Sequence, residues 1–145
     1  MCSGEIPEIY RSVEKKYDDA LEIDPNLTSA WNRKGIFLGT FCRFDESITC
    51  FDEALKIDST LAEVWNNKGV SLDWMEKHNE SMGCYDRAIE LEPQLAVAWM
   101  NRARTLSLNL SLFSLAKANA SQAIELNPSL ENESLQMTWN YIQAF

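Results

Sequence analysis

The sequence has few of the residues from which catalytic and metal centres are usually built. It contains one histidine, His78, and only five glycines. We find no phosphate-binding glycine loop, no nucleophile motif and no zinc-ligand spacing. We therefore predict that the chain is not an enzyme, with no catalytic residues, no metal and no cofactor. His78, in a polar turn, is expected to be solvated.

The cysteines do not indicate a catalytic or metal-binding site either. There are four of them, Cys2, Cys42, Cys50 and Cys84. None belongs to a C-x-x-C pair, and we interpret all four as small, buried, reduced residues, which is typical of a cytosolic protein. The sequence thus predicts a cytoplasmic location.

Positive charge and long apolar runs are also scarce. Lysine and arginine number 13 against 22 acidic residues, so the net charge is −9. Binding to nucleic acid or to an anionic membrane depends on basic residues that neutralise phosphates, so this surface would repel both. No apolar stretch approaches the roughly 20 residues of a membrane-spanning helix, and the N-terminus lacks the layout of a secretory signal. We predict neither nucleic acid nor membrane as a partner.

What the sequence does contain is a repeat. Trp31, Trp65 and Trp99 stand 34 residues apart. A fixed period of this size predicts stacked structural repeats, whose extended surfaces suit binding better than chemistry. The same period is followed by Tyr17, Phe51 and Tyr85, and by Ala20, Ala54 and Ala88.

Each period is predicted to form two helices. Apolar residues recur at helical spacing, and Pro25, Pro93 and Pro128 mark helix ends because proline cannot continue a helix. The third period holds one extra residue, which we place in its central turn. The expected single array, 1–145, consists of a lone second helix at 8–25, helix pairs at 28–59, 62–93 and 96–128, and a capping helix at 131–145. Whether the chain is a complete array or a piece of a longer one stays open.

The repeat resembles the tetratricopeptide repeat family, whose pattern is W-x2-L-G-x2-Y…A-x3-F…P. Here the pattern reads Trp65-x2-Lys68-Gly69-x2-Leu72…Ser81-x3-Tyr85…Pro93. The resemblance implies an all-α fold, an α-α superhelix (solenoid) of about three helix-turn-helix units with a leading half-repeat and a C-terminal capping helix. The third unit departs from the pattern, with Ala103 for the glycine and Ala120 for the aromatic residue, so its packing is expected to be looser or rearranged.

In this family the first helices of successive units line a concave groove. The resemblance therefore implies a protein–protein interaction module or scaffold that binds a peptide or helix of a partner there. The predicted groove residues, which are positions not needed for packing, are Asn32, Arg33, Ile36, Asn66, Asn67, Val70, Trp74, Met100, Asn101 and Arg104.

Two features of this set have alternative interpretations. Asn67 and Asn101 share one repeat position and could bond a peptide backbone, because an amide both donates and accepts; alternatively they are ordinary surface asparagines. Trp74 lies outside the repeated core positions and is either an anchor for the partner or packed against a neighbouring turn.

The charge pattern predicts the type of partner. Basic residues in the first helices (Arg33, Lys34, Lys68, Arg102 and Arg104) contrast with acidic second helices. We expect a neutral-to-basic groove that favours an acidic segment or a free C-terminus; the alternative is solvated faces with pairs inside helices.

The sequence bears on three other roles. Family members that bind heat-shock chaperones clamp a terminal carboxylate, but by repeat position only Asn67 matches that set, so an adaptor role of this kind is not expected. Self-assembly into a homo-oligomer through open end helices is one alternative function, with Ile9, Tyr10 and Val13, or Trp139 and Phe145, as the candidate apolar stripe. The other is a regulatory arm of a larger protein.

Overall fold

The computed structural model describes residues 6–108 and 112–130, and these ranges contain helices but no strand. The predicted all-α class is therefore confirmed, while the predicted capping helix at 131–145 lies outside the described residues. The helices are α1 (Glu8–Ile23), α2 (Thr28–Thr40), α3 (Phe44–Ile57), α4 (Ala62–Trp74), α5 (His78–Leu91), α6 (Ala96–Leu108), α7 (Phe113–Leu126) and a short 3₁₀-helix, η1 (Pro128–Leu130).

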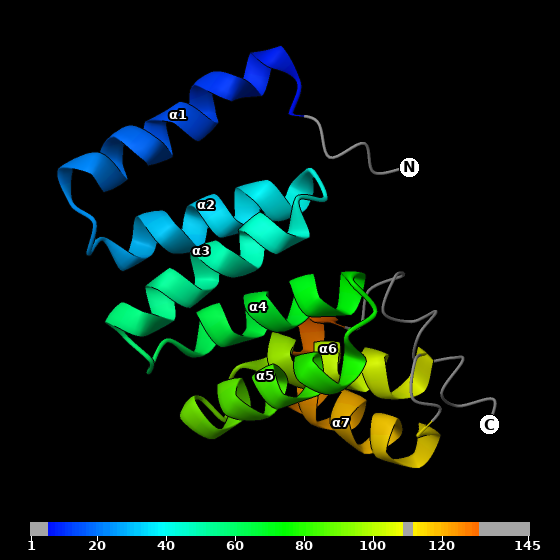
Figure 1. The fold of residues 1–145 in the computed structure, drawn as a ribbon. Coiled ribbons are helices and arrows are strands. Elements are labelled where there is room, and N and C mark those ends of the chain that lie inside the picture. Colours follow the sequence, from blue (N-terminus) through cyan, green and yellow to red (C-terminus); the bar gives the residue numbers. More distant parts are fainter. Residues whose placement is uncertain (1–5, 109–111, 131–145) are drawn as a thin grey trace.

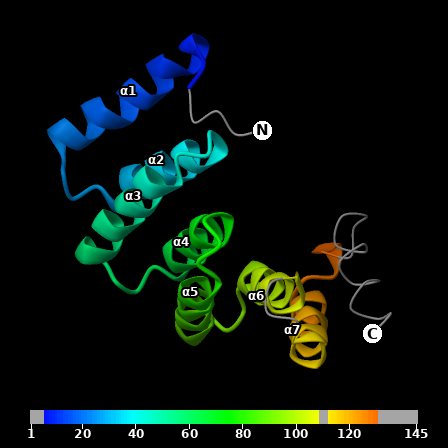
Figure 2. The same ribbon diagram turned by 45° about the vertical axis from the view of Figure 1, so that its right-hand side comes forward.

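The helices stack in chain order, as Figure 1 shows. They form helix–turn–helix pairs, α2 with α3, α4 with α5 and α6 with α7. Figure 2 shows α4 above α5 and α6 above α7. The first helices also touch one another, α2 with α4 and α4 with α6, so they line one side of the superhelix. α1 lies at one end and packs on α2.

Within a pair, a glycine of the first helix receives an aromatic ring of the second. A Cβ atom at Gly35 would lie 2.6 Å from Phe51 Cε1, and one at Gly69 would lie 2.7 Å from Tyr85 Cε1. Real Cβ contacts are not this short, so only glycine allows the helices to approach so closely. Phe51 and Tyr85 are consequently buried completely.

The repeated tryptophans hold the turns between successive units. Each indole N–H donates to a backbone carbonyl six residues earlier. These bonds run from Trp31 to Pro25 (2.9 Å), from Trp65 to Ser59 (3.0 Å) and from Trp99 to Pro93 (3.0 Å). The turn therefore forms at Ser59 without a proline. The three indole N–H groups stabilise the fold and are not available to a ligand.

The turn inside each of the first two pairs contains a residue in the left-handed region, Cys42 (φ 62°) or Glu76 (φ 61°). A side chain in this conformation costs about 1–2 kcal/mol that glycine avoids. We expect Glu76→Gly to raise the free energy of unfolding by about 1 kcal/mol, measured by urea denaturation. Glu80→Gly, within the helical backbone of α5, should lower it by about the same amount; two changes of the same sign would contradict this account.

The cysteines are not all alike. Cys50 and Cys84 are free and buried, and burial raises the pKa of each thiol to about 11, so both stay protonated as expected. Cys42 is disulfide-bonded, and the prediction of a reduced thiol is wrong for this residue.

Two features are absent from the described residues. No helix among them combines the length and apolar character needed to cross a membrane. No group of three or more histidine, cysteine or acidic residues within them could hold a metal ion.

Candidate functional site

Asparagines connect the three first helices across the predicted groove. Asn67 Nδ2 donates to Asn32 Oδ1 (3.1 Å), and Asn101 Nδ2 donates to Asn66 Oδ1 (3.0 Å). A longer contact, from Asn66 Nδ2 to Asn67 Oδ1 (3.4 Å), joins the two bonds into one network. Both shorter bonds connect residues 35 apart, so the same contact recurs from α2 to α4 and from α4 to α6. The structure therefore brings these four predicted residues together. Part of their hydrogen-bonding capacity is used in bonds to one another.

Two predicted groove residues are buried. Asn66 is 4% exposed and Met100 is 7% exposed, so neither offers surface to a partner. Met100 belongs to the apolar cluster that contains Ala103 and Ala120, where the glycine–aromatic pair of the other repeats is missing. The rearranged packing of the third unit thus takes this methionine into the core.

An apolar cavity of about 410 Å³ lies between α2 and α4. Its lining includes Ile36, Gly39, Val70, Trp74 and Asn67. Three of these side chains, those of Ile36, Val70 and Trp74, are apolar and were predicted to line the groove. The cavity is large enough for an amino-acid side chain, and Asn67 supplies an amide at its edge.

Two serine side chains in the lining of this cavity already have hydrogen-bond partners within the protein. Ser47 Oγ donates to the Gly35 carbonyl oxygen (2.7 Å) and lies 3.0 Å from Ser71 Oγ. Because these hydroxyls already have partners, they do not require water or a polar ligand. The cavity is therefore suited to an apolar group.

Trp74 forms a wall of the cavity and remains 65% exposed. Its ring stacks on Phe44, with centroids 6.1 Å apart and planes 1° from parallel. Both interpretations of Trp74 thus hold in part, because the indole packs on a neighbour and still presents surface. Phe44, the first residue of α3, was missed from the sequence, since the equivalent positions hold Tyr10 and His78 and show no shared pattern.

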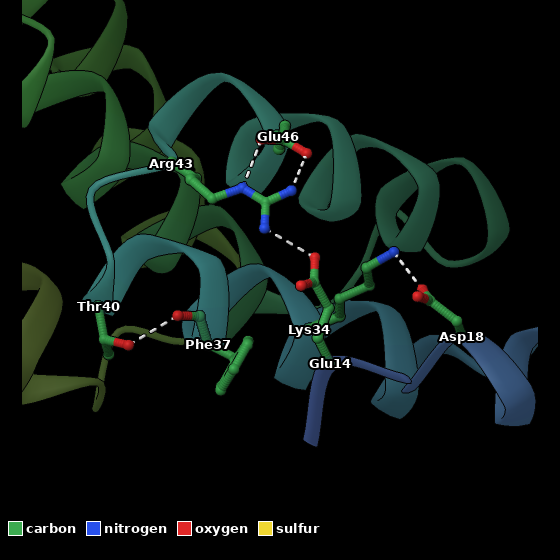
Figure 3. Close-up of polar contacts among 7 residues, drawn as sticks. All are labelled: Glu14, Asp18, Lys34, Phe37, Thr40, Arg43 and Glu46. Carbon is green, nitrogen blue, oxygen red and sulfur yellow. Dashed lines mark hydrogen bonds and ion pairs between the residues drawn. The ribbon is translucent and has the colours of Figure 1, made fainter. Parts of the chain in front are cut away.

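Three of the cations expected in the groove point elsewhere. The residue before the small residue of each repeat (Gly35, Gly69 or Ala103) forms an ion pair with the second helix of the preceding unit, and Figure 3 shows the first of these pairs. The pairs are Lys34–Asp18 (2.6 Å), Lys68–Asp52 (2.6 Å) and Arg102–Asp86 (2.7 Å). The groove is therefore less basic than expected.

Arg33 and Arg104 are the basic residues that remain on the groove side. Arg33 is exposed and shares a shallow recess with Asn32 and Glu63. Arg104 is half-buried and shares another recess with Asp73. Each cation thus lies near a carboxylate, so the groove is close to neutral.

Asp73 lies on the groove side as the sequence predicts, but its hydrogen-bond network was not predicted from the sequence. Its side chain is 10% exposed and accepts hydrogen bonds from Ser81 Oγ (2.5 Å), Tyr85 Oη (2.9 Å) and Thr105 Oγ1. His78 Nδ1 lies 3.2 Å from it, so this histidine begins α5 in contact with Asp73 rather than in a solvated turn. Burial and the Asp73 charge raise the pKa of Tyr85 above its ordinary value, which keeps its hydroxyl a donor.

Comparison with known proteins agrees with this geometry. The sequence profile of the family described as "Tetratricopeptide repeat" matches residues 62–95. Comparison with curated protein sequences finds no match.

Solved structures of the same fold are similar over most of the chain. The first TPR of Spaghetti (RPAP3), bound to the HSP90 peptide SRMEEVD, has a TM-score of 0.75 at 18% identity, covering 81% of this chain and 90% of that one. The Arabidopsis OM64 TPR domain gives 0.75 at 14% identity, with 81% and 94% covered. The TPR2B domain of yeast Sti1, in a pHsp70 complex, gives 0.74 at 15%, with 81% and 96% covered. At these identities the likeness shows the fold, and the family profile identifies residues 62–95, which contain α4 and α5, as a tetratricopeptide repeat.

Proposed function

We propose that the chain is a protein-interaction module that holds a peptide segment of a partner in the groove formed by α2, α4 and α6. The observation that carries the proposal is the apolar cavity between α2 and α4, with the exposed indole of Trp74 in its wall. Apolar surface gains free energy when it leaves water, so this cavity favours a large apolar side chain of the partner. Asn67 at its edge can then orient the peptide backbone.

The fold neighbours support a peptide as the ligand class. Two of them were solved with chaperone-derived ligands, the HSP90 peptide on Spaghetti and pHsp70 on yeast Sti1. Chaperone tails are not proposed for this chain, because the positions equivalent to the carboxylate clamp hold Asn32, Ile36, Val97 and Asn101 beside the one match, Asn67. Only Arg33 and Arg104 still support the prediction of an acidic or C-terminal segment as the partner.

Three sequence-based expectations stay predictions. They are a cytoplasmic location, self-assembly into a homo-oligomer, and service as an arm of a larger protein. None of them is needed for the groove to bind a peptide.

The experiment is a selection of short random peptides displayed on phage, with the full chain as bait. Enriched peptides should share a large apolar residue. Trp74→Ala should then raise the Kd of a selected peptide about 30-fold, because a buried aromatic anchor contributes about 2 kcal/mol. Isothermal titration calorimetry measures both values.

The matched control is Leu115→Ala, which also removes an exposed apolar side chain, here from α7, outside the groove. We expect this variant to change the Kd less than about twofold. Absence of any enriched peptide, or selected peptides that bind the Trp74→Ala variant as tightly as the parent, would refute the proposal.

A further inference from the structure

The apolar cavity between α2 and α4 has an equivalent one repeat further along the array. A recess of about 350 Å³ lies between α4 and α6, beside the start of α5. Each described residue that lines this recess stands 34 positions after a residue that lines the cavity. The equivalent pairs are Gly39 and Asp73, Thr40 and Trp74, Cys42 and Glu76, Phe44 and His78, Val70 and Arg104, and Trp74 and Leu108. A segment that lies across α2, α4 and α6 therefore meets two sites in the same register.

The two sites differ in chemistry because the same repeat positions hold different residues. Among the described residues, the lining of the cavity includes no charged side chain. The recess is lined by Asp73, Glu76 and Arg104, and also by His78, whose Nδ1 lies 3.2 Å from Asp73. This charged recess thus keeps the register of the cavity but favours a different kind of side chain.

The charged recess has an excess of negative charge, since it holds two carboxylates and one guanidinium. Beside the larger effect of burial, Asp73 raises and Arg104 lowers the pKa of Tyr85. Both charges therefore lie close to this hydroxyl and offset one another. Glu76 is exposed and makes no hydrogen bond or ion pair with any other residue that the structure describes. Its carboxylate is available to a cation of a partner.

Trp74 supplies an aromatic wall to both sites. The Phe44 ring stacks on the indole and lines only the cavity, so it leaves the part of the indole that lines the charged recess uncovered. Within the described helices, no lysine or arginine lies over this indole. Leu108, which is 56% exposed, forms a second apolar wall of the recess. A lysine or arginine side chain suits such a site, because its aliphatic stem packs on apolar walls and its cation is attracted to an aromatic face.

We propose that the charged recess binds a lysine or arginine side chain of the peptide whose apolar residue occupies the cavity. The inference rests on the proposed function and specifies its ligand, a segment that combines a large apolar residue with a basic one. At this point of the groove a basic residue is favoured over the acidic one predicted from the sequence, because Asp73 and Glu76 outnumber Arg104. The net charge of −9 also attracts a basic segment over longer distances.

The distance between the two sites determines the spacing of the two partner residues. The first helices α2, α4 and α6 touch one another in order. Neighbouring helices pack about 10 Å apart and an extended chain advances about 3.3 Å per residue, so the basic residue should stand about two to four positions from the apolar one.

The first measurement is the composition of the peptides that the full chain selects from the random phage library. Lysine or arginine should be enriched about two to four positions from the large apolar residue. The tightest peptide is then synthesised with lysine, glutamine or glutamate at the enriched position, and isothermal titration calorimetry gives each Kd. The lysine peptide should bind about fivefold more tightly than the glutamine peptide, and the glutamate peptide should bind most weakly.

Glu76→Gln tests the carboxylate that carries this selectivity. Glutamine keeps the size of the side chain at an exposed position, so the fold and the apolar cavity should be retained. The preference for the lysine peptide over the glutamine peptide should fall below about twofold. The matched control is Glu80→Gln, which removes the same charge from an exposed position on α5 outside the recess. In this control the preference should stay at about fivefold, because solvent and salt screen the more distant charge.

Three results would overturn the inference while selection of apolar peptides still supported the proposed function. They are selected peptides without an enriched basic residue, an unchanged preference in the Glu76→Gln variant, and tightest binding by the glutamate peptide. If the full chain selects no peptide at all, the proposed function and this inference both fail.

Discussion

Asp73→Ala is expected to lower the free energy of unfolding by about 3 kcal/mol, as measured by urea denaturation followed by far-ultraviolet circular dichroism. The carboxylate accepts hydroxyl hydrogen bonds from Ser81 and Tyr85 on α5 and from Thr105 on α6. Ser81 and Thr105 each have a backbone carbonyl as a second partner, and the Tyr85 hydroxyl has the Thr105 side chain beside it. Alanine would remove the buried charged acceptor that the three hydroxyls share.

The matched control is Asp19→Ala, which removes the same charge from an exposed position on α1. Asp19 makes no hydrogen bond or ion pair within residues 6–108 and 112–130, so its loss should change the free energy of unfolding by less than about 0.5 kcal/mol. If Asp73→Ala is no more destabilising than this control, the buried network does not hold the three helices together.

Tyr85→Phe separates the hydrogen bond from the charge. It removes one donor and keeps the ring, so we expect a loss of about 1–2 kcal/mol, smaller than for Asp73→Ala. The comparison bears on the groove, because Asp73 precedes Trp74 and connects α4 to α5 and α6. The network therefore determines how the second and third repeats are inclined beside the cavity.

The period of the sequence predicted the fold because each repeated residue has the same packing task in every unit. A tryptophan that bonds the preceding turn and a glycine that receives an aromatic ring are local requirements, so they recur at fixed spacing. Such requirements can be found by aligning the chain with itself. The helix–turn–helix pairing could be predicted directly from this alignment.

The candidate site was less predictable because its contacts occur once and join different units. The donors to Asp73 come from α5 and α6, and Trp74 stacks on Phe44 from the preceding repeat. Lys34 was assigned to the groove by its helix, yet the rotation of that helix directs it to Asp18. Met100 is buried because Ala120 leaves space that an aromatic residue fills elsewhere. Each outcome depends on the angle between neighbouring helices, which a one-dimensional period does not encode.

Gly69→Ala should be about as destabilising as Asp73→Ala, lowering the free energy of unfolding by about 2–3 kcal/mol. The new methyl carbon would lie 2.7 Å from Tyr85 Cε1. The ring cannot move aside easily, because its hydroxyl is bonded to Asp73 (2.9 Å) and the residue is fully buried. Alanine favours the helix by about 1 kcal/mol over glycine, which offsets only part of the clash.

Gly83→Ala provides a control with the opposite sign. Gly83 lies on the exposed side of α5, with no atom within 4 Å of an added Cβ. The same substitution there should raise the free energy of unfolding by about 1 kcal/mol, since only the helix preference acts. Stabilisation by both substitutions would show that the contact between Gly69 and the ring is not tight.

A double substitution tests the steric cause directly. The third repeat already pairs Ala103 with Ala120, and both are buried to 1% exposure or less. Alanine at position 69 should therefore be tolerated once Tyr85 is also alanine, although Tyr85→Ala alone costs about 3–5 kcal/mol. In a double-mutant cycle the loss for Gly69→Ala should shrink to zero or become a gain. Additive losses would mean that the glycine is required by something other than the aromatic ring.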